Sequence, residues 1–282
     1  MKKYLSLIKF SHTIFAMPFA LIGFFIASHS YTINWETLIQ IILCMIFARS
    51  SAMAFNRYAD REIDLKNPRT ATIREIPKGN IKPKQALLFV IINSLLFITT
   101  TYFINHICFI LSPIALLIIL GYSITKRFTS LCHIILGIGL SLAPIGSYLA
   151  VTGSFHIIPI LFSIVVLFWV SGFDIIYSLQ DYEFDKMNKL YSIPVLVGKK
   201  NALYISKVLH LITIITLVLI GQENYFNTLY WIGFSVFSIL LIYQHTLVTE
   251  NNLTKVNLAF FTTNGIGSVI LAIFIILELL IN

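Results

Sequence analysis

Long apolar runs follow one another along almost the whole chain. We place nine of them, at approximately residues 10–30, 37–58, 85–104, 107–123, 132–151, 157–180, 201–221, 226–247 and 257–280. Runs of about 20 apolar residues cross the roughly 30 Å hydrocarbon core of a bilayer as helices. The runs are continuous and do not alternate with polar residues, which favours helices over a barrel. The pattern predicts an all-α polytopic membrane protein, with residues 1–282 forming a single domain of nine transmembrane helices.

The connections between the runs differ in charge. The chain is 57% hydrophobic and only 11% charged, whereas a soluble domain carries about 25% charged residues. Apart from Arg49, inside the second run, all of the 20 Lys and Arg residues lie at the N-terminus or in connections on the same side. The positive-inside rule therefore places the N-terminus and these connections in the cytoplasm. The net charge of +8 reflects this topology, and no nucleic-acid partner is predicted.

Eight of the 12 acidic residues fall in two short stretches, where the second and sixth runs reach the cytoplasmic side. The two stretches contain Asp60, Glu62, Asp64 and Glu75, and then Asp174, Asp181, Glu183 and Asp185. Both share the pattern D-x-E-x-D, in DREID at 60–64 and DYEFD at 181–185. Residues four apart share a face of a helix, so the two Asp of each motif are expected to point the same way and the Glu away.

Each acidic face extends inward along its helix. The first face reaches Asn56 and then Arg49, and the second reaches Tyr177 and Asp174. Arg57 and Arg61 leave the first face, so topology and solubility explain them, whereas Arg69 in the following loop is expected to close over a ligand. The pattern predicts a polar stripe on each helix that begins within the bilayer and ends at the cytoplasmic surface.

Converging carboxylates in a partly dry site need cations. Carboxylate oxygens suit Mg²⁺, which fills its other positions with water and substrate phosphates. No His or Cys accompanies the acids, which argues against zinc. Acids for Mg²⁺ and interleaved bases for phosphate oxygens, together at a membrane surface, indicate a lipid diphosphate as ligand.

Other interpretations of the same residues stay open at this point. Each acidic stripe could be an ion-pair cluster that caps a helix, and Arg49 could extend to the nearby interface. An ion-coupled transporter would also carry intramembrane acids, but here the acids lie toward one face and are matched by bases. A lipid-linked phosphotransferase is expected to show a Gly-rich D-x-x-D-G string, which the sequence lacks.

At these motifs the sequence resembles the UbiA superfamily of intramembrane aromatic prenyltransferases, in its 4-hydroxybenzoate polyprenyltransferase branch. The motif N-x-x-x-D-x-x-x-D matches Asn56, Asp60 and Asp64, and D-x-x-x-D matches Asp181 and Asp185. Further matches are ARSSAMAFNRYADREIDLKNPRTATIREIPKG, GYSITKRFT and SIPVLVGKKNAL. The resemblance covers nearly the whole chain and implies a bundle of nine helices around a central cavity that opens sideways to lipid.

The resemblance also implies roles for individual residues. The metal and diphosphate set comprises Asn56, Asp60, Asp64, Asp181 and Asp185, which hold Mg²⁺. Lys126 looks like a diphosphate-binding lysine, with Arg127, Tyr122 and Arg69 as helpers. Arg49 and Asp174 match polar positions deeper in the cavity, near the acceptor. The string SLCHIILG departs from the family pattern, so His133 within it is only a weak site candidate, and a core histidine is the expected interpretation.

The implied reaction is transfer of a polyprenyl group from polyprenyl diphosphate to a ring carbon of an aromatic acid. Arg49 would pair with the acceptor carboxylate, and Asp174 would polarise the hydroxyl and accept the ring proton. The expected acceptor is of the 4-hydroxybenzoate type, for ubiquinone, and the alternative is a dihydroxynaphthoate, for menaquinone. The expected location is the inner cell membrane, with the active site toward the cytoplasm.

Overall fold

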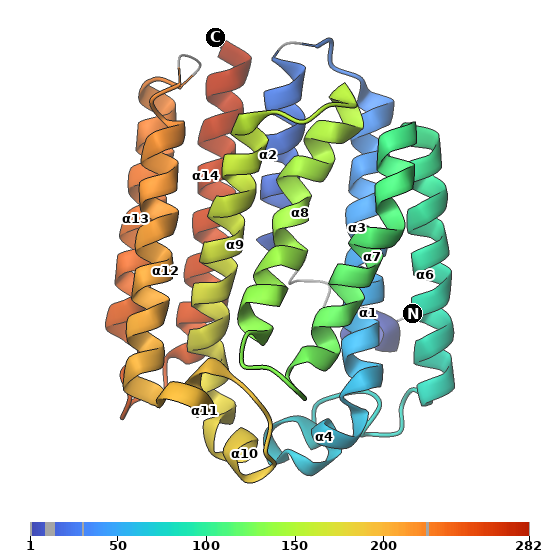
Figure 1. The fold of residues 1–282 in the computed structure, drawn as a ribbon, viewed down its shortest axis with the longest axis vertical. Coiled ribbons are helices and arrows are strands. Elements are labelled where there is room, and N and C mark those ends of the chain that lie inside the picture. Colours follow the sequence, from blue (N-terminus) through green and yellow to red (C-terminus); the bar gives the residue numbers. More distant parts are fainter. Residues whose placement is uncertain (1, 9–14, 30, 224–225, 282) are drawn as a thin grey trace.

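The chain folds into a bundle of long helices that lie side by side (Figure 1). This computed structural model describes residues 2–8, 15–29, 31–223 and 226–281, and no strand occurs among them. The long helices are α2 (Met17–Ser28), α3 (Trp35–Ala59), α6 (Pro83–Ile104), α7 (His106–Thr125), α8 (Cys132–Thr152), α9 (Ile157–Ser178), α12 (Lys199–Ile220), α13 (Thr228–Leu247) and α14 (Thr263–Ile281). The short ones are α1 (Lys2–Leu7), α4 (Arg61–Lys66), α5 (Pro68–Ala71), η2 (Leu179–Asp181), α10 (Tyr182–Met187), α11 (Ile193–Val197) and the π-helix η3 (Leu258–Thr262).

Of the nine membrane-crossing helices that we predicted, the described residues establish eight by length and composition. Eight helices among the described residues are long and apolar enough to cross a bilayer. The first predicted span, 10–30, corresponds to α2, which has only 12 residues, while residues 10–14 and 30 lie outside the described part. The interior position of α2 is clear, because Phe19 and Phe24 are completely buried. The cytoplasmic location of the N-terminus stays a prediction.

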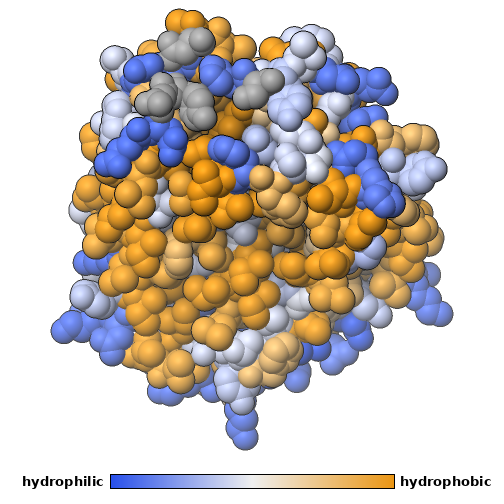
Figure 2. All heavy atoms as spheres, turned by 45° about the horizontal axis from the view of Figure 1, so that its top comes forward, coloured by the Kyte–Doolittle hydropathy of each residue, from blue (hydrophilic) through white to orange (hydrophobic). Residues whose placement is uncertain are grey.

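The bundle has an apolar exterior as well as an apolar core. Large hydrophobic side chains such as Leu117, Leu95 and Ile239 are exposed on the outer surfaces of their helices. Figure 2 shows apolar residues across the middle of the viewed face and hydrophilic ones gathered toward its edges. Such a surface is stable against lipid tails and not against water.

The connection between α6 and α7 is very short, as the bounds of the predicted runs 85–104 and 107–123 imply. A single residue, Asn105, separates α6 from α7. Its side-chain oxygen accepts a hydrogen bond from the Cys108 amide at 2.9 Å, and its amide nitrogen donates to the Leu149 carbonyl at 2.8 Å. Asn105 therefore caps α7 and ties the hairpin to α8.

Both acidic motifs lie where a long helix breaks. Helix α3 ends at Ala59, and Asp60 (φ −87°, ψ 8°) separates it from α4; Asp181 (φ −99°, ψ 3°) likewise precedes α10. The continuous helical face that we predicted for each motif is therefore wrong in detail. The Asp64 amide still donates to the Asp60 carbonyl at 2.7 Å, so the first motif keeps its helical turn. Helices α4, α10 and α11 gather at the lower end of the bundle in Figure 1.

Candidate active site

A cavity of about 660 Å³ lies between α3, α7, α8 and α9 and is polar toward the acidic motifs. Eight of the predicted site residues line it, namely Arg49, Asn56, Asp60, Arg69, Tyr122, Lys126, Asp174 and Asp181. The other three, Asp64, Asp185 and Arg127, do not line it. Residues from both acidic motifs, which lie far apart in the sequence, thus line the same cavity.

Each of the four motif aspartates is paired with a different base. The pairs are Asp60 with Arg127 (3.6 Å), Asp64 with Arg74, Asp181 with Arg69, and Asp185 with Lys126 (2.7 Å). Each of these carboxylates is thus matched by a positive charge. The arrangement confirms that acids and bases meet at one place, as their interleaving indicated.

Asp181 is held by the loop that follows the first motif. Arg69 donates to both of its carboxylate oxygens, through Nε to Oδ1 at 2.9 Å and through Nη2 to Oδ2. Asn67 donates to the same Oδ1 at 2.9 Å, and Tyr177 Oη accepts from Arg69 Nη1 at 3.2 Å. Burial alone would lower the pKa of Arg69, but the hydrogen bonds and charge of Asp181 hold that pKa above its usual value.

Asp60 lies at the cavity surface and touches the predicted amide partner. Asn56 Nδ2 donates to Asp60 Oδ2 at 3.0 Å, so these two residues share a face as expected. Burial, followed by the negative charge of Asp64, holds the pKa of the Asp60 carboxyl above its usual value. A positive charge placed beside Asp60 would therefore be strongly favoured.

Asp64 and Asp185 lie behind the cavity wall, which corrects the prediction that they face the ligand directly in this conformation. They are 3% and 0% exposed. Among the described residues, no hydrogen-bond partner meets Asp64 Oδ2 or Asp185 Oδ1. An unpaired buried carboxylate oxygen is costly, and a hard cation satisfies it.

The oxygen atoms of the two motifs can be compared with the ligands that a divalent cation requires. In the described part of the chain, no three His, Cys, Asp or Glu side chains are already gathered as a metal site. The motifs nevertheless offer carboxylate and amide oxygens, two of them buried without a partner. These residues fit a hard divalent cation in donor chemistry, provided that bases now paired with them are displaced.

Arg57 corrects another prediction. We expected it to leave the face of the first motif, but it lines the cavity and is 6% exposed, and its Nη1 donates to Asn56 Oδ1 at 2.7 Å. The backbone of Arg57 lies on another face of α3, but its long side chain extends to the face that carries Asn56. Arg61 stays outside the cavity, with its guanidinium 4.8 Å from the ring centroid of Tyr58.

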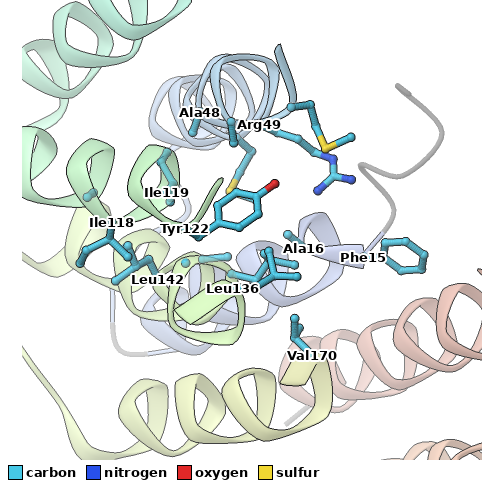
Figure 3. A pocket seen from close by; sticks show the side chains of 18 of the residues that line it. Phe15, Ala16, Ala48, Arg49, Ile118, Ile119, Tyr122, Leu136, Leu142 and Val170 are labelled. Atoms are coloured by element: carbon cyan, nitrogen blue, oxygen red, sulfur yellow. The ribbon is translucent and has the colours of Figure 1, made fainter. Parts of the chain in front are cut away.

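Arg49 and Tyr122 form the deeper polar part of the cavity. Figure 3 shows both pointing into a space bordered by apolar residues such as Phe15 and Leu136. Arg49 Nε is buried and has no hydrogen-bond partner among the described residues. Arg49 therefore faces the cavity and does not extend to the interface, which was the alternative interpretation.

His133 lies in the same wall as Asp174. It is buried, as expected of a core histidine, but it also lines the cavity and its Nδ1 is 2.7 Å from Asp174 Oδ2. Sequence reasoning missed this contact, along with Arg57 and Arg74 at the acidic end. A polar residue that interrupts an apolar run, as His133 does, was the available signal.

The cavity opens on the flank of α7 and α8. Ile114, Gly146 and Phe155 line the cavity there and are all exposed. Phe15 lines the cavity, whereas Phe19 and Phe24 of α2 are completely buried in the core. An apolar chain could thus leave the cavity sideways into lipid.

Comparison with known proteins agrees with this architecture. The family model of the UbiA prenyltransferase family matches residues 16–266. The 4-hydroxybenzoate octaprenyltransferase of Tolumonas auensis is 30% identical over 237 residues, covering 84% of this chain and 82% of that protein. The protein of the same name from Photobacterium profundum is 27% identical over 241 residues, with coverage of 84% and 82%.

Solved structures share the fold. The apo structure of a UbiA homolog from Aeropyrum pernix K1 superposes with a TM-score of 0.81 at 27% identity, covering 96% of this chain and 97% of that one. A UbiA homolog from Archaeoglobus fulgidus bound to GPP and Mg²⁺ gives a TM-score of 0.75 at 22% identity, with coverage of 98% and 99%.

Proposed function

Because this chain is a prenyltransferase that belongs to the UbiA prenyltransferase family, we propose that it transfers a polyprenyl group from polyprenyl diphosphate to an aromatic acid of the 4-hydroxybenzoate type. One observation carries this proposal. The same cavity has residues of both aspartate motifs and several bases at one end, and a half-buried arginine and a carboxylate deeper inside. The first set suits a diphosphate, and the second suits an aromatic acid.

The diphosphate half rests on the four ion pairs. Arginine and lysine bind phosphate oxygens as they bind carboxylates, so Arg69 and Lys126 can turn from aspartate to diphosphate without leaving the site. The aspartates released in this way, with Asn56, would hold Mg²⁺. When bound, Mg²⁺ supplies a Lewis acid that stabilises charge on the leaving diphosphate. The GPP and Mg²⁺ named for the Archaeoglobus relative support this assignment.

The acceptor half rests on Arg49 and Asp174. The fork of Arg49 matches a carboxylate, and within the described part of the chain its Nε has no hydrogen-bond partner. Pairing there would orient the acceptor ring in the cavity, with its hydroxyl toward Asp174 in the opposite wall. The apolar lining excludes water, which would otherwise quench a cation-like allylic carbon.

The acceptor and the location are inferred from the relatives and from the charge pattern. The named relatives favour 4-hydroxybenzoate, and with it a role in ubiquinone biosynthesis, over a dihydroxynaphthoate for menaquinone. The bacterial origin of these relatives favours the inner membrane, and the positive-inside rule places the acidic end toward the cytoplasm. A transporter is no longer favoured, because the family consists of prenyltransferases.

An acceptor panel tests the proposal. The protein in lipid vesicles is incubated with a labelled polyprenyl diphosphate, Mg²⁺ and one acceptor at a time: 4-hydroxybenzoate, a dihydroxynaphthoate or phenol. We expect label on a ring carbon of 4-hydroxybenzoate, with release of diphosphate. Preferential labelling of the naphthoate would move the proposal to the alternative acceptor, and no transfer to any aromatic acid would refute it.

A further inference from the structure

The imidazole of His133 lies behind the carboxylate of Asp174 in the wall of the cavity. Nδ1 of His133 is 2.7 Å from Oδ2 of Asp174, and both residues line the cavity. The Asp174 side chain is 22% exposed, whereas that of His133 is 3% exposed. One oxygen of Asp174 is therefore held from behind, and the carboxylate still faces the cavity.

Helices α8 and α9 pack closely beside His133. A Cβ on Gly137 would collide with the Leu167 carbonyl oxygen and the Ser171 hydroxyl, so α8 and α9 approach closely only because this residue is glycine. Ser171 Oγ also donates to the His133 carbonyl at 3.2 Å. Such close packing fixes the position of His133 relative to Asp174.

Within the described residues, the second ring nitrogen of His133, Nε2, lacks the hydrogen bond that a purely structural histidine would make. This atom is buried and meets no hydrogen-bond partner in the described part of the chain. Buried polar atoms in a core are nearly always satisfied, and an unsatisfied one reduces stability. The contact with Asp174 is thus the interaction that accounts for a histidine at this place.

We propose that His133 is a positioning residue for Asp174, which it orients so that the other carboxylate oxygen takes the proton lost by the acceptor ring. The inference rests on the proposed function, because it assumes an aromatic acceptor. With its proton on Nδ1, the imidazole donates to Oδ2 and leaves Nε2 as a bare acceptor. In the low dielectric of the cavity wall, this hydrogen bond also stabilises the anionic carboxylate before the proton arrives.

The proton transfer completes the substitution. The bond between the allylic carbon and the diphosphate oxygen breaks, and its electron pair leaves with the diphosphate. A π-electron pair of the ring forms the new carbon–carbon bond. The ring carbon then loses its proton to the free oxygen of Asp174, and the pair of that C–H bond restores aromaticity.

Substitutions at His133 separate orientation from packing. An asparagine amide comes where Nδ1 of histidine lies, whereas a glutamine amide comes where Nε2 lies. His133→Asn should therefore keep much of the contact with Asp174, and His133→Gln and His133→Leu should lose it. His210→Gln is a matched control, because His210 is a buried histidine outside the cavity with contacts to His245 and Trp169.

The measurement is turnover with 4-hydroxybenzoate deuterated at the ring carbons next to the hydroxyl, using full-length protein in vesicles. We expect His133→Gln and His133→Leu to lower kcat by about 10- to 100-fold, the usual effect of removing an orienting partner. Proton loss should then limit the rate, so an isotope effect on kcat should appear that the wild type lacks. Donor KM should stay unchanged, and His133→Asn should restore most of kcat.

The outcomes are distinct. The control His210→Gln should show no isotope effect, whatever its kcat. The role of His133 would be overturned, and the proposed function left intact, if His133→Gln kept the wild-type kcat or lost kcat without an isotope effect. A wild-type protein that releases diphosphate but prenylates no aromatic acid would instead overturn the proposed function. Full loss in His133→Asn, equal to that in His133→Leu, would also contradict the orienting contact.

Discussion

Arg69 and Asp181 connect the two acidic motifs across 112 residues of sequence, through donor contacts from Nε and Nη2 to both carboxylate oxygens. Arg69 stands in the loop after the first motif, and Asp181 begins the second. The pair fixes the polar end of the cavity and keeps an arginine where a diphosphate would bind. This position suits Arg69 to serve both as a structural link and as a ligand for the proposed donor.

Replacing Arg69 should therefore impair use of the donor. We expect Arg69→Leu to lower kcat/KM for polyprenyl diphosphate by about 10²–10³-fold, the range found when a preorganised donor to developing charge is removed. Arg69→Lys should recover only part of this loss, because lysine keeps the charge but not the fork. Steady-state kinetics in vesicles measures both.

The control for this prediction is Arg61→Leu. Arg61 is a neighbouring arginine that stacks on Tyr58 and does not line the cavity. Its replacement should leave kcat/KM for the donor near the wild-type value. Equal losses in Arg61→Leu and Arg69→Leu would mean that general positive charge, and not the placement of Arg69, serves the donor.

Arg49 should affect the acceptor and not the donor. Truncating one partner of a buried charge pair costs about 2–5 kcal/mol, so Arg49→Leu should raise KM for 4-hydroxybenzoate strongly and leave KM for the donor unchanged. The wild type should also prefer 4-hydroxybenzoate over phenol, and Arg49→Leu should lose this preference. A variant with equal effects on both substrates would reassign Arg49 to the diphosphate.

The aromatic wall beside the acidic end should protect the reacting carbon. Phe260, in the π-helix η3, lines the cavity and stacks on Tyr177 with ring centroids 4.2 Å apart. A cation near an aromatic face in a dry site gains about 0.5–2 kcal/mol. We expect Phe260→Leu to divert several-fold more donor to free prenol, measured as the ratio of prenol to prenylated acid.

Phe261 supplies a matched control for the same π-helix. It is the next residue but does not line the cavity. Phe261→Leu should leave the ratio of prenol to prenylated acid unchanged, even if it lowers total turnover. A ratio that rises equally in both variants would show that packing of the π-helix, and not the face of Phe260, excludes water.

Packing of the buried helix α2 gives a prediction about stability. A Cβ on Gly23 would collide with the Pro144 carbonyl group of α8. Gly23→Val should therefore lower the free energy of unfolding by about 1–3 kcal/mol, as overpacking commonly does. Gly121→Ala is the control, because a Cβ there meets open space. Thermal unfolding in detergent measures the stability of both variants. An equal loss of stability in the two would contradict this prediction.

The sequence predicted the elements and motifs that repeat at regular spacing. Apolar length places the helices, and four-residue spacing brings Asn56 beside Asp60 in the structure. The charge pattern also puts acids and bases at one end of the cavity. These features depend on local periodicity, which a single sequence displays directly.

The partners of each aspartate could not be predicted in the same way. Arg74 lies ten residues after Asp64, beyond a short helix and a turn, and only the folded loop brings them together. Arg57 faces away along the helix, yet its flexible side chain reaches the cavity. Loop conformation and long side chains override helical spacing at such places, and the break at Asp60 adds a bend that the spacing does not contain.

The central claim is that the two motifs form one catalytic site. The direct measurement is prenyl transfer with excess Mg²⁺ in vesicles by Asp60→Ala and Asp181→Ala, compared with Glu62→Ala and Glu183→Ala. The two glutamates belong to the same motifs, but their side chains are 80% and 69% exposed. We predict that both aspartate variants insert and fold but lose transfer, while both glutamate variants keep it. Near-normal transfer by either aspartate variant would contradict the account.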